Sequence, residues 1–435
     1  MNLRTTLLAF LCLCAATVLH AERVDMLKIG AKANGKVLNT KLINTTIDRL
    51  NRNGGGTLFF PAGTYLTGSI RLKSNITLEL EAGATLLFSD NFDDYLPFVE
   101  VRHEGVMMKS FQPLIYAVDA ENITIKGEGT LDGQGKKWWM EFFRVMIDLK
   151  DNGMHDLNKY QPMWDAENDT TAIYTETNKD YVSTIQPVRC KKVKIEGVKI
   201  VNSPFWTVNP EFCDNVTIKG ITIDNVPSPN TDGINPESCR NVHISDCHIS
   251  VGDDCITIKS GRDAQARRLG VPCENITITN CTMLSGHGGV VIGSEMSGSV
   301  RKVTISNCVF DGTERGIRIK STRGRGGVVE DIRVSNIVMS NIKQEAVVLN
   351  LKYSPMPAEP KSERTPIFRN VHISGMTVTD VKTPIKIVGL EEAPISDIVL
   401  RDIHIQGGKQ KCIFEDCERI TMDDVIVNGE ELKLK

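Results

Sequence analysis

Four short segments in the middle of the chain combine acidic, basic and histidine side chains with short apolar runs. They read NTDGINPESC (230–239), GDDCITIKSG (252–261), SGHGGVVIGSE (285–295) and ERGIRIKS (314–321). Paired carboxyl groups suit hydrolysis of a glycosidic bond, because one can donate a proton to the leaving oxygen while another activates water. The segments therefore predict a hydrolytic site, provided that the fold brings them together.

Asp232, Asp253 and Asp254 are the candidate acid and base groups, and His287 is their candidate neighbour. Like charges a few ångströms apart raise one another's pKa, so three close aspartates are costly unless their charges are used or neutralised. The plain structural alternative is a set of turn aspartates before glycine, and Asp232 alone would favour it. The combination with His287 favours catalysis.

Two cations follow the acids in the chain. Ile317 and Ile319 alternate as core residues, so Arg318 and Lys320 are expected to point to solvent, as is Lys259 by the same alternation. Outward cations beside acids would hold an anionic group, which in a sugar is the carboxylate of a uronate. A solvated charged face is the alternative.

The same alternation divides the acidic residues into two sets. Asp253 and His287 have outward parity, whereas Asp232 and Asp254 do not. Asp232 and Asp254 must then lie where the chain bends into the strand or be paired inside, and spacing leaves both options open.

A repeat positions these segments. A run of alternating apolar residues such as VKIEGVKI recurs with starts at Val193, Val216, Val242, Ile276, Val303, Ile332, Val371, Ile398 and Ile420. A second series lies between these runs: DGINP, DCITIK, GGVVIG, RGIRIK, EAVVLN, TPIKIV and KCIF. Two strand runs per coil without helical segments predict an all-β fold, a right-handed parallel β-helix, rather than a sandwich of hairpins. Alignment of the second series places Asp232 and Asp254 in one column on adjacent coils.

The beginning of the chain carries two further signals. Residues 1–21 have a basic residue, a short apolar run and a small terminal residue, which predict a signal peptide and a secreted or periplasmic protein without a membrane span in its mature form. An uncleaved anchor is the alternative. Residues 33–55 show helical spacing of apolar residues before a glycine stop, which predicts a short helix that caps a solenoid. Residues 22–435 are expected to form one β-helix catalytic domain.

Ten cysteines follow the predicted signal peptide and fall in repeat columns. Coils stack about 4.8 Å apart, so a column places thiols above one another. A ladder of small buried side chains is favoured. A disulfide between neighbours such as Cys190 and Cys213 stays open, and the spacing of a zinc site is absent.

The net charge of −3 and the mixed distribution of charges give no basic stripe, so nucleic acid is not expected as a partner. Residues 140–183 interrupt the repeat and are interpreted as a functional loop or lid, with a tolerated insertion as the alternative.

The ordered motifs resemble the polygalacturonase family of glycoside hydrolases (family 28). Its marks stand here as Asn230-Thr231-Asp232, Gly252-Asp253-Asp254, Gly286-His287-Gly288 and Arg318-Ile319-Lys320. The resemblance implies a right-handed parallel β-helix that hydrolyses galacturonan with inversion and without a metal or other cofactor. It also implies that Asp253 is the general acid, that Asp232 and Asp254 position and activate water, and that His287 supports the acid or binds substrate.

The resemblance further implies that Asn230, Arg318 and Lys320 bind galacturonate, and Tyr353 is the candidate for a tyrosine that the family has one coil later. The leading hypothesis is a monomeric hydrolase of α-1,4-galacturonosyl bonds in pectin or oligogalacturonides, with exo action plausible because residues 140–183 can close one end of the groove. The alternatives are a hydrolase of rhamnogalacturonan or xylogalacturonan, a pectate lyase, and a non-catalytic glycan-binding β-helix.

Overall fold

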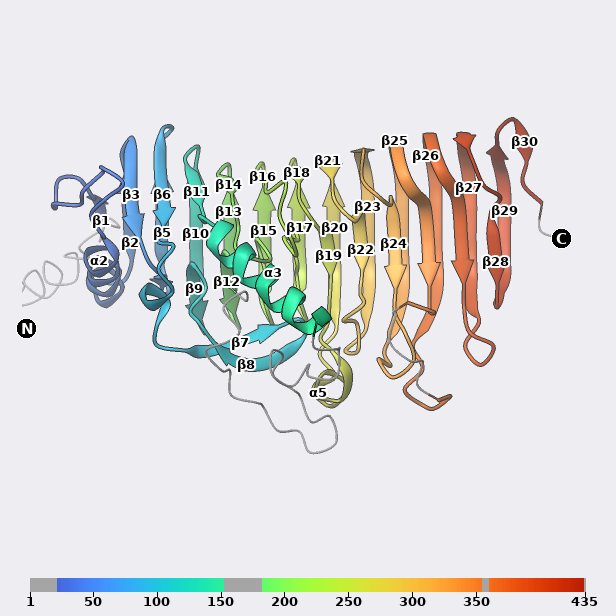
Figure 1. Cartoon of the computed structure of the whole chain (residues 1–435), viewed down its shortest axis with the longest axis horizontal. Helices are drawn as coiled ribbons and strands as arrows, with labels where there is room; N and C mark the ends of the chain where they lie inside the picture. The colour runs from blue at the N-terminus through green and yellow to red at the C-terminus, as the bar shows by residue number, and fades with distance from the viewer. Residues whose placement is uncertain (1–21, 152–181, 354–359, 434–435) are drawn as a thin grey trace, which may run out of the picture.

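The fold is a solenoid of parallel strands stacked along one long axis (Figure 1). The computed structural model describes residues 22–151, 182–353 and 360–433. The predicted signal peptide (1–21) and most of the interruption at 140–183 lie outside these residues. A single buried apolar cluster runs inside the coils from Val24 to Val425. The predicted parallel β-helix is confirmed.

Three columns of strands make up the coils. The column that carries the predicted site, here called the site column, contains β4 (Ile70–Leu72), β9 (Ile115–Val118), β12 (Ile185–Val188), β19 (Asp254–Ile258), β22 (Gly288–Ile292), β24 (Ile317–Lys320) and β28 (Ile413–Glu415). The second column contains β1 (Glu22–Asp25), β2 (Gly56–Phe60), β5 (Ile76–Leu80), β10 (Glu121–Gly127), β13 (Lys191–Glu196), β15 (Asp214–Lys219), β17 (Arg240–Ser245) and β20 (Cys273–Thr279).

The third column contains β3 (Gly63–Thr67), β6 (Ala84–Phe88), β11 (Thr130–Asp132), β14 (Lys199–Val201), β16 (Thr222–Asp224), β18 (His248–Ser250) and β21 (Thr282–Ser285). Later coils run through two or three columns as long bent strands: β23 (Val300–Asp311), β25 (Val328–Asn350), β26 (Ile367–Val388), β27 (Ile395–Gly408) and β29 (Cys417–Val427). A short β30 (Glu430–Glu431) pairs antiparallel with β29.

The register of the second column matches the repeat read from the sequence. Val193 pairs with Val216, which pairs with Val242, and the same alignment continues through every predicted start to Ile420. The prediction of two strand runs per coil is wrong, because the first run bends into two strands. Left-handed backbone at residues such as Gly197 (φ 76°), Asp246 (φ 59°) and Asn280 (φ 55°) makes the bend, and glycine, aspartate and asparagine tolerate that conformation.

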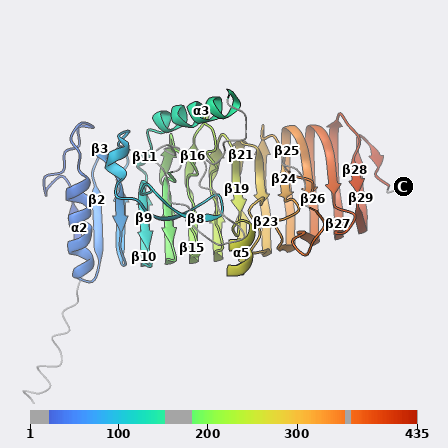
Figure 2. The same cartoon turned by 60° about the horizontal axis from the view of Figure 1, so that its bottom comes forward.

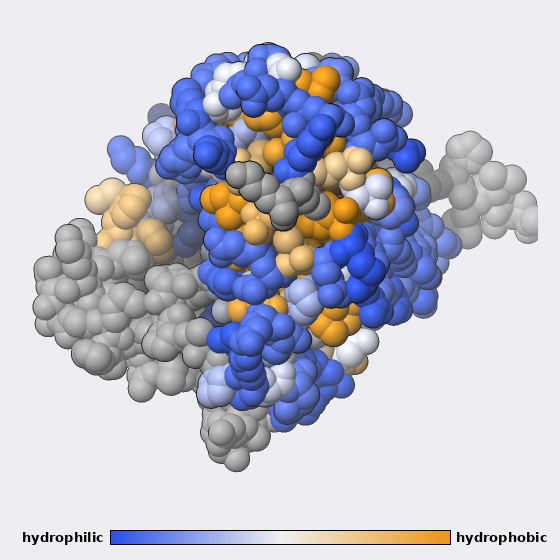
Figure 3. Space-filling view, turned by 90° about the vertical axis from the view of Figure 1, so that its right-hand side faces the viewer, coloured by the Kyte–Doolittle hydropathy of each residue, from blue (hydrophilic) through white to orange (hydrophobic). Residues whose placement is uncertain are grey.

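The two ends of the solenoid differ. At the N-terminal end, the predicted capping helix is α2 (Thr40–Arg52), which buries Ile43, Ile47 and Leu50 against the first coils. At the C-terminal end, apolar side chains of the last coil, including Phe414 and Met422, are only partly buried, and apolar surface shows between charged side chains in the end-on view (Figure 3).

The structure adds helices that the repeat does not predict. They are α3 (Lys136–Asp151), α5 (Asp263–Leu269) and a 3-10 turn, η1 (Phe92–Tyr95). Helix α3 lies outside the coils and runs along them (Figure 2). In the described ranges, no helix combines the length and the apolarity that crossing a membrane would require.

A hairpin covers part of the site column. Strands β7 (Val99–His103) and β8 (Val106–Ser110) leave the coil of β6 and cross several later coils (Figure 1). The Arg102 guanidinium is buried there, 3.5 Å from a carboxylate oxygen of Glu237, and donates to the hydroxyl of Ser238. Arg262 donates its backbone N–H to Gly105 at the turn of the hairpin. The outer face of the site column is therefore partly covered by protein.

The cysteine columns are confirmed, with one exception. Cys190, Cys213, Cys239 and Cys273 stack in the second column, and all ten described cysteines are free thiols. Because Lys386 pairs with Ile413, Cys412 lies one residue away from the column of Cys255 in which the sequence reading placed it. The ladder of buried side chains, not the disulfide alternative, describes the structure.

The thiol ladder predicts the labelling of the native protein. Of the ten cysteines that the structure describes, a thiol reagent such as DTNB should label at most Cys412 and Cys417, because the other eight thiols are buried. Under denaturing, non-reducing conditions all ten of these should react, as counted by absorbance and mapped by mass spectrometry. A missing pair after denaturation would show that a disulfide such as Cys190–Cys213 forms instead.

Candidate active site

The predicted acids come together at the entrance to the site column. The pairing of Ile234 with Ile256 places Asp232 and Asp254 at equivalent positions of adjacent coils, as predicted. The N–H of Gly233, next to Asp232, donates to the carbonyl oxygen of Asp254 at 3.0 Å. The backbone ladder itself therefore fixes the spacing of these two carboxyl groups.

Asp254 is paired inside the protein with two cations. Its Oδ1 accepts from Nη1 of Arg318 at 3.2 Å, and its Oδ2 accepts from Nζ of Lys320 at 2.8 Å. Burial alone would raise the pKa of this carboxyl group, but Lys320 and Arg318 together lower it to about 2. Asp254 is therefore a carboxylate at any neutral or mildly acidic pH.

Asp232 is also buried, but in a different environment. Its Oδ2 accepts hydrogen bonds from Nδ2 of Asn235 at 2.9 Å and from the hydroxyl of Thr257 at 3.4 Å, and Nζ of Lys259 lies 3.7 Å away. Burial and the charge of Asp253 raise the pKa of Asp232 well above its usual range, and Lys259 opposes that rise. The two buried acids thus differ in how strongly they hold a proton.

The predicted exposure of the cations is wrong. The Lys259 side chain is only 5% exposed and donates to Oε2 of Glu295 at 2.8 Å, while Lys320 is buried against Asp254. Alternation assigns a side chain to a face of the strand, and here the outer face is covered. Every residue of β19 and β22 is buried, so both faces of these strands lie inside protein.

Asp253 and His287 are the acid and base groups that solvent reaches. The Asp253 side chain is 21% exposed, and its Oδ1 lies 3.1 Å from Nδ1 of His287, whose side chain is 46% exposed. The hydrogen bond to Asp253 raises the pKa of His287, so the imidazolium is favoured there. Nε2 of His287 lies 3.9 Å from a carboxylate oxygen of Glu314 on the following coil.

Two glycines keep this cluster compact. A Cβ on Gly286 (φ 153°) would stand 2.6 Å from the carbonyl oxygen of Asp253, and one on Gly252 would overlap the carbonyl oxygen of Ser228. A larger residue at Gly286 would push the turns that carry Asp253 and His287 apart, and one at Gly252 would push the Asp253 turn away from the Ser228 turn that leads to Asp232.

The remaining predicted residues lie around the same centre. The ring centroid of Tyr353 is 5.5 Å from the Arg318 guanidinium and 5.2 Å from the Lys320 ammonium group, so Tyr353 lies beside both predicted cations. Asn230 precedes Thr231, whose hydroxyl accepts the N–H of Gly252 at 3.2 Å. All eight predicted site residues therefore belong to turns and strands that meet at the site column.

Sequence reasoning missed three residues of this arrangement. Glu295 and Glu314 belong to quoted segments, but neither was selected, because their partners Lys259 and His287 are distant in sequence. Trp206, whose ring centroid is 4.3 Å from Nζ of Lys259, lies in none of the four segments.

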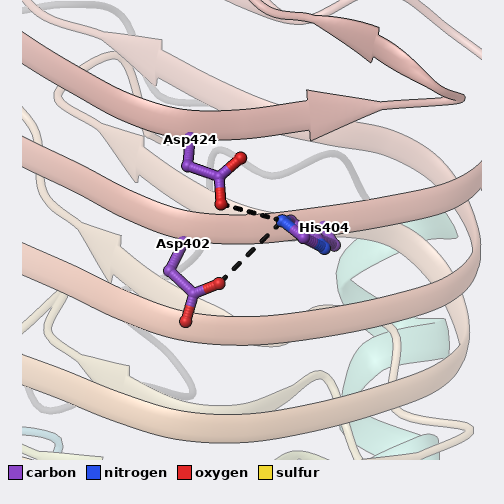
Figure 4. A group of neighbouring side chains, drawn as sticks. All are labelled: Asp402, His404 and Asp424. Atoms are coloured by element: carbon purple, nitrogen blue, oxygen red, sulfur yellow. Dashed lines mark hydrogen bonds and ion pairs between the residues drawn. The ribbon is translucent and has the colours of Figure 1, made fainter.

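A separate group of metal-ligand type lies on the later coils. Asp402, His404 and Asp424 offer ligand atoms within 4.8 Å of one another (Figure 4). All three are exposed, and Nε2 of His404 lies 3.3 Å from Asp424 and 3.9 Å from Asp402. Polar surface contacts between the His404 ring and two exposed aspartates account for this group.

Comparison with known proteins identifies the family. Residues 144–425 match the model of glycosyl hydrolases family 28. The chain belongs to this family. As a family 28 chain it is a glycoside hydrolase, and the family resemblance read from its four motifs is confirmed.

Family 28 relatives cover most of the chain. A probable polygalacturonase of Vitis vinifera is 31% identical over 397 residues, which are 89% of this chain and 74% of that protein. The crystal structure of a hyperthermoactive exopolygalacturonase from Thermotoga maritima has 35% identity and a TM-score of 0.84, covering 94% of this chain and 92% of that one. An exo-poly-alpha-D-galacturonosidase of Dickeya chrysanthemi is 28% identical, and there the match covers 76% of this chain but only 57% of the relative.

The ion pairs of Asp254 predict how stability depends on pH. Its pKa is about 2 in the folded protein and about 3.9 in an unfolded chain, so the carboxylate contributes stability above pH 4 that is lost as pH falls toward 2. Asp254→Asn should therefore lower the free energy of unfolding by about 2 kcal/mol or more at pH 7, and the difference from wild type should shrink as the pH falls from 4 to 2. Denaturant unfolding at several pH values measures this, and a difference independent of pH would contradict the pairing.

Proposed function

We propose that this family 28 hydrolase cleaves α-1,4-galacturonosyl linkages of polygalacturonate with inversion and acts from a chain end. The observation that carries the proposal is the division of labour among three carboxyl groups. Asp253 is open to solvent beside His287, whereas Asp232 and Asp254 are buried and held by separate cations.

The acid role fits Asp253. Its carboxyl group is the accessible one of the three, and the neighbouring imidazolium of His287 can return a proton to it through their direct contact at 3.1 Å. Protonated Asp253 would give its proton to the leaving glycosidic oxygen.

The base role fits Asp232 and Asp254. Both sit one coil apart at the start of the site column, so a water molecule between them would meet two acceptors. One of them, Asp254, is fixed as a carboxylate by its two cations. Attack by this water on the face opposite to the leaving oxygen would invert the anomeric carbon.

The substrate preference follows from Arg318, Lys320 and Tyr353. In the free protein the two cations neutralise Asp254, and Tyr353 lies beside both cations. Arg318 has five N–H donors and uses one on Asp254, so it can also hold the carboxylate of a bound galacturonate. Asn230, on the turn beside Gly252, would add a polar contact at the cleavage point.

The exo mode is supported by two of the relatives. The Thermotoga and Dickeya relatives are both named as exo-acting. Helix α3 stands outside the coils at the insertion that follows β11 and runs along them (Figure 2).

Asp253→Asn should lower kcat on polygalacturonate by about 10²–10⁴-fold, because the leaving oxygen loses its proton donor. Release of reducing ends measures the rate, and the melting temperature should stay close to that of wild type. Asp246→Asn is the matched control, since Asp246 is an exposed turn residue whose left-handed backbone suits asparagine. Unchanged turnover in Asp253→Asn would refute the assignment.

The products formed from defined oligogalacturonides test the exo mode and the polymer. Galacturonate monomer should be the only short product from the first time point, whereas a ladder of sizes would show endo action. Faster release from rhamnogalacturonan or xylogalacturonan would reassign the substrate. Unsaturated products absorbing in the ultraviolet would indicate a lyase.

A further inference from the structure

The two buried acids of the site differ in the number of cations within ion-pair distance. Asp254 is in direct contact with both Arg318 and Lys320. Among the residues that the structure describes, Lys259 is the one cation within ion-pair distance of Asp232, at 3.7 Å. Lys259 is therefore the cation whose loss would change the charge beside Asp232 most directly.

Lys259 is held in place from two sides. Oε2 of Glu295 accepts from its Nζ at 2.8 Å, and the Trp206 ring centroid lies 4.3 Å from the same atom. Glu295 is itself fixed, because its Oε1 accepts from the hydroxyl of Ser294 at 2.8 Å and lies 3.8 Å from a guanidinium nitrogen of Arg325. With 5% of its side chain exposed, Lys259 is too deeply buried to take substrate directly.

We propose that Lys259 is a positioning residue that holds the Asp232 carboxyl group in place and favours its ionised form for its work on water, and that Glu295 limits this effect by pairing with Lys259. This inference rests on the proposed function, in which Asp232 and Asp254 act on the attacking water. It assigns roles to two residues that are distant from each other in sequence and whose side chains are little exposed, 5% for Lys259 and 12% for Glu295.

The surrounding charges give the direction of each effect. Asp232 faces the negative charges of Asp253 and Asp254 and the positive charges of Lys259 and Lys320, and burial raises its pKa further. Burial and the two aspartates raise the pKa of Asp232, and Lys259 lowers it. Removing Lys259 would therefore raise the pKa of Asp232.

Glu295 acts on Asp232 with the opposite sign. It faces Lys259, Arg325 and Lys320, and these cations outweigh its burial and lower its pKa well below the usual range, so it is a full negative charge. More distant charged groups around it include Glu104 and Arg262 of the covering segments. Neutralising Glu295 would remove a competitor for Lys259 and a nearby negative charge, so the pKa of Asp232 would fall.

The test is the pH profile of kcat/KM on oligogalacturonide for Lys259→Met and Glu295→Gln. The acid limb of this profile reports the pKa of the group that acts as base, which must be ionised for activity. It should move up by about one pH unit or more in Lys259→Met. In Glu295→Gln it should move down by a smaller amount. Lys259→Arg, which keeps the charge, should restore most of the wild-type profile.

Arg369→Met is the control, because Arg369 pairs with Glu330 on the later strands β25 and β26. It should leave the acid limb in place. Shifts of the same sign in Lys259→Met and Glu295→Gln, or unmoved limbs in both, would overturn the proposal. If Lys259→Met does not fold, the downward shift in Glu295→Gln decides alone.

A measurement without substrate separates this inference from the proposed function. The melting temperatures of Lys259→Met, Asp232→Asn and the double variant form a cycle at pH 7. The loss in the double variant should be clearly smaller than the sum of the single losses, and additivity would overturn the coupling. If the wild type cleaves no galacturonan, the proposed function fails, and this cycle still tests whether Lys259 supports Asp232.

Discussion

The in-register stacking of coils is the constraint on which the molecule depends. Each coil offers its backbone N–H and C=O groups to the next, and the pairing of Ile234 with Ile256 or Val290 with Ile317 repeats one alignment along the axis. Residues far apart in sequence therefore occupy neighbouring positions about 4.8 Å apart. The cluster of candidate catalytic residues is a direct product of this alignment, because no helix or domain interface is needed to assemble it.

Stacking also brings carboxyl groups close together, and nearby cations in the site column compensate for their repulsion. Carboxyl groups placed one coil apart repel each other, and burial makes their charges more costly. The chain places cations on later coils, so that Lys259, one coil on, faces Asp232, while Lys320 and Arg318, two coils on, face Asp254. Of the three aspartates, Asp253 is the exposed one and lies beside exposed His287, whereas Asp232 and Asp254 are enclosed.

The sequence predicted the repeat and the column positions well, because alternating apolar residues report directly which side chains fill the core. It placed Asp232 beside Asp254, and His287 beside Asp253, from spacing alone. It failed for Lys259 and Lys320, since alternation says which face a residue takes and not what covers that face. The β7–β8 hairpin arises many residues before the site, and the sequence around Lys259 or Glu295 does not indicate its presence.

The unequal ends of the solenoid determine where the molecule begins to open. Helix α2 closes the first coil, whereas the last coil leaves apolar side chains partly uncovered. Fraying should therefore start at the C-terminal end, and in a stack held only by neighbour contacts it can stop at any coil. The strands β26, β27 and β29 follow Tyr353, the last predicted site residue in the chain, so they can open before the site is disturbed. The acids can then stay aligned while the last coils of the protein unfold locally.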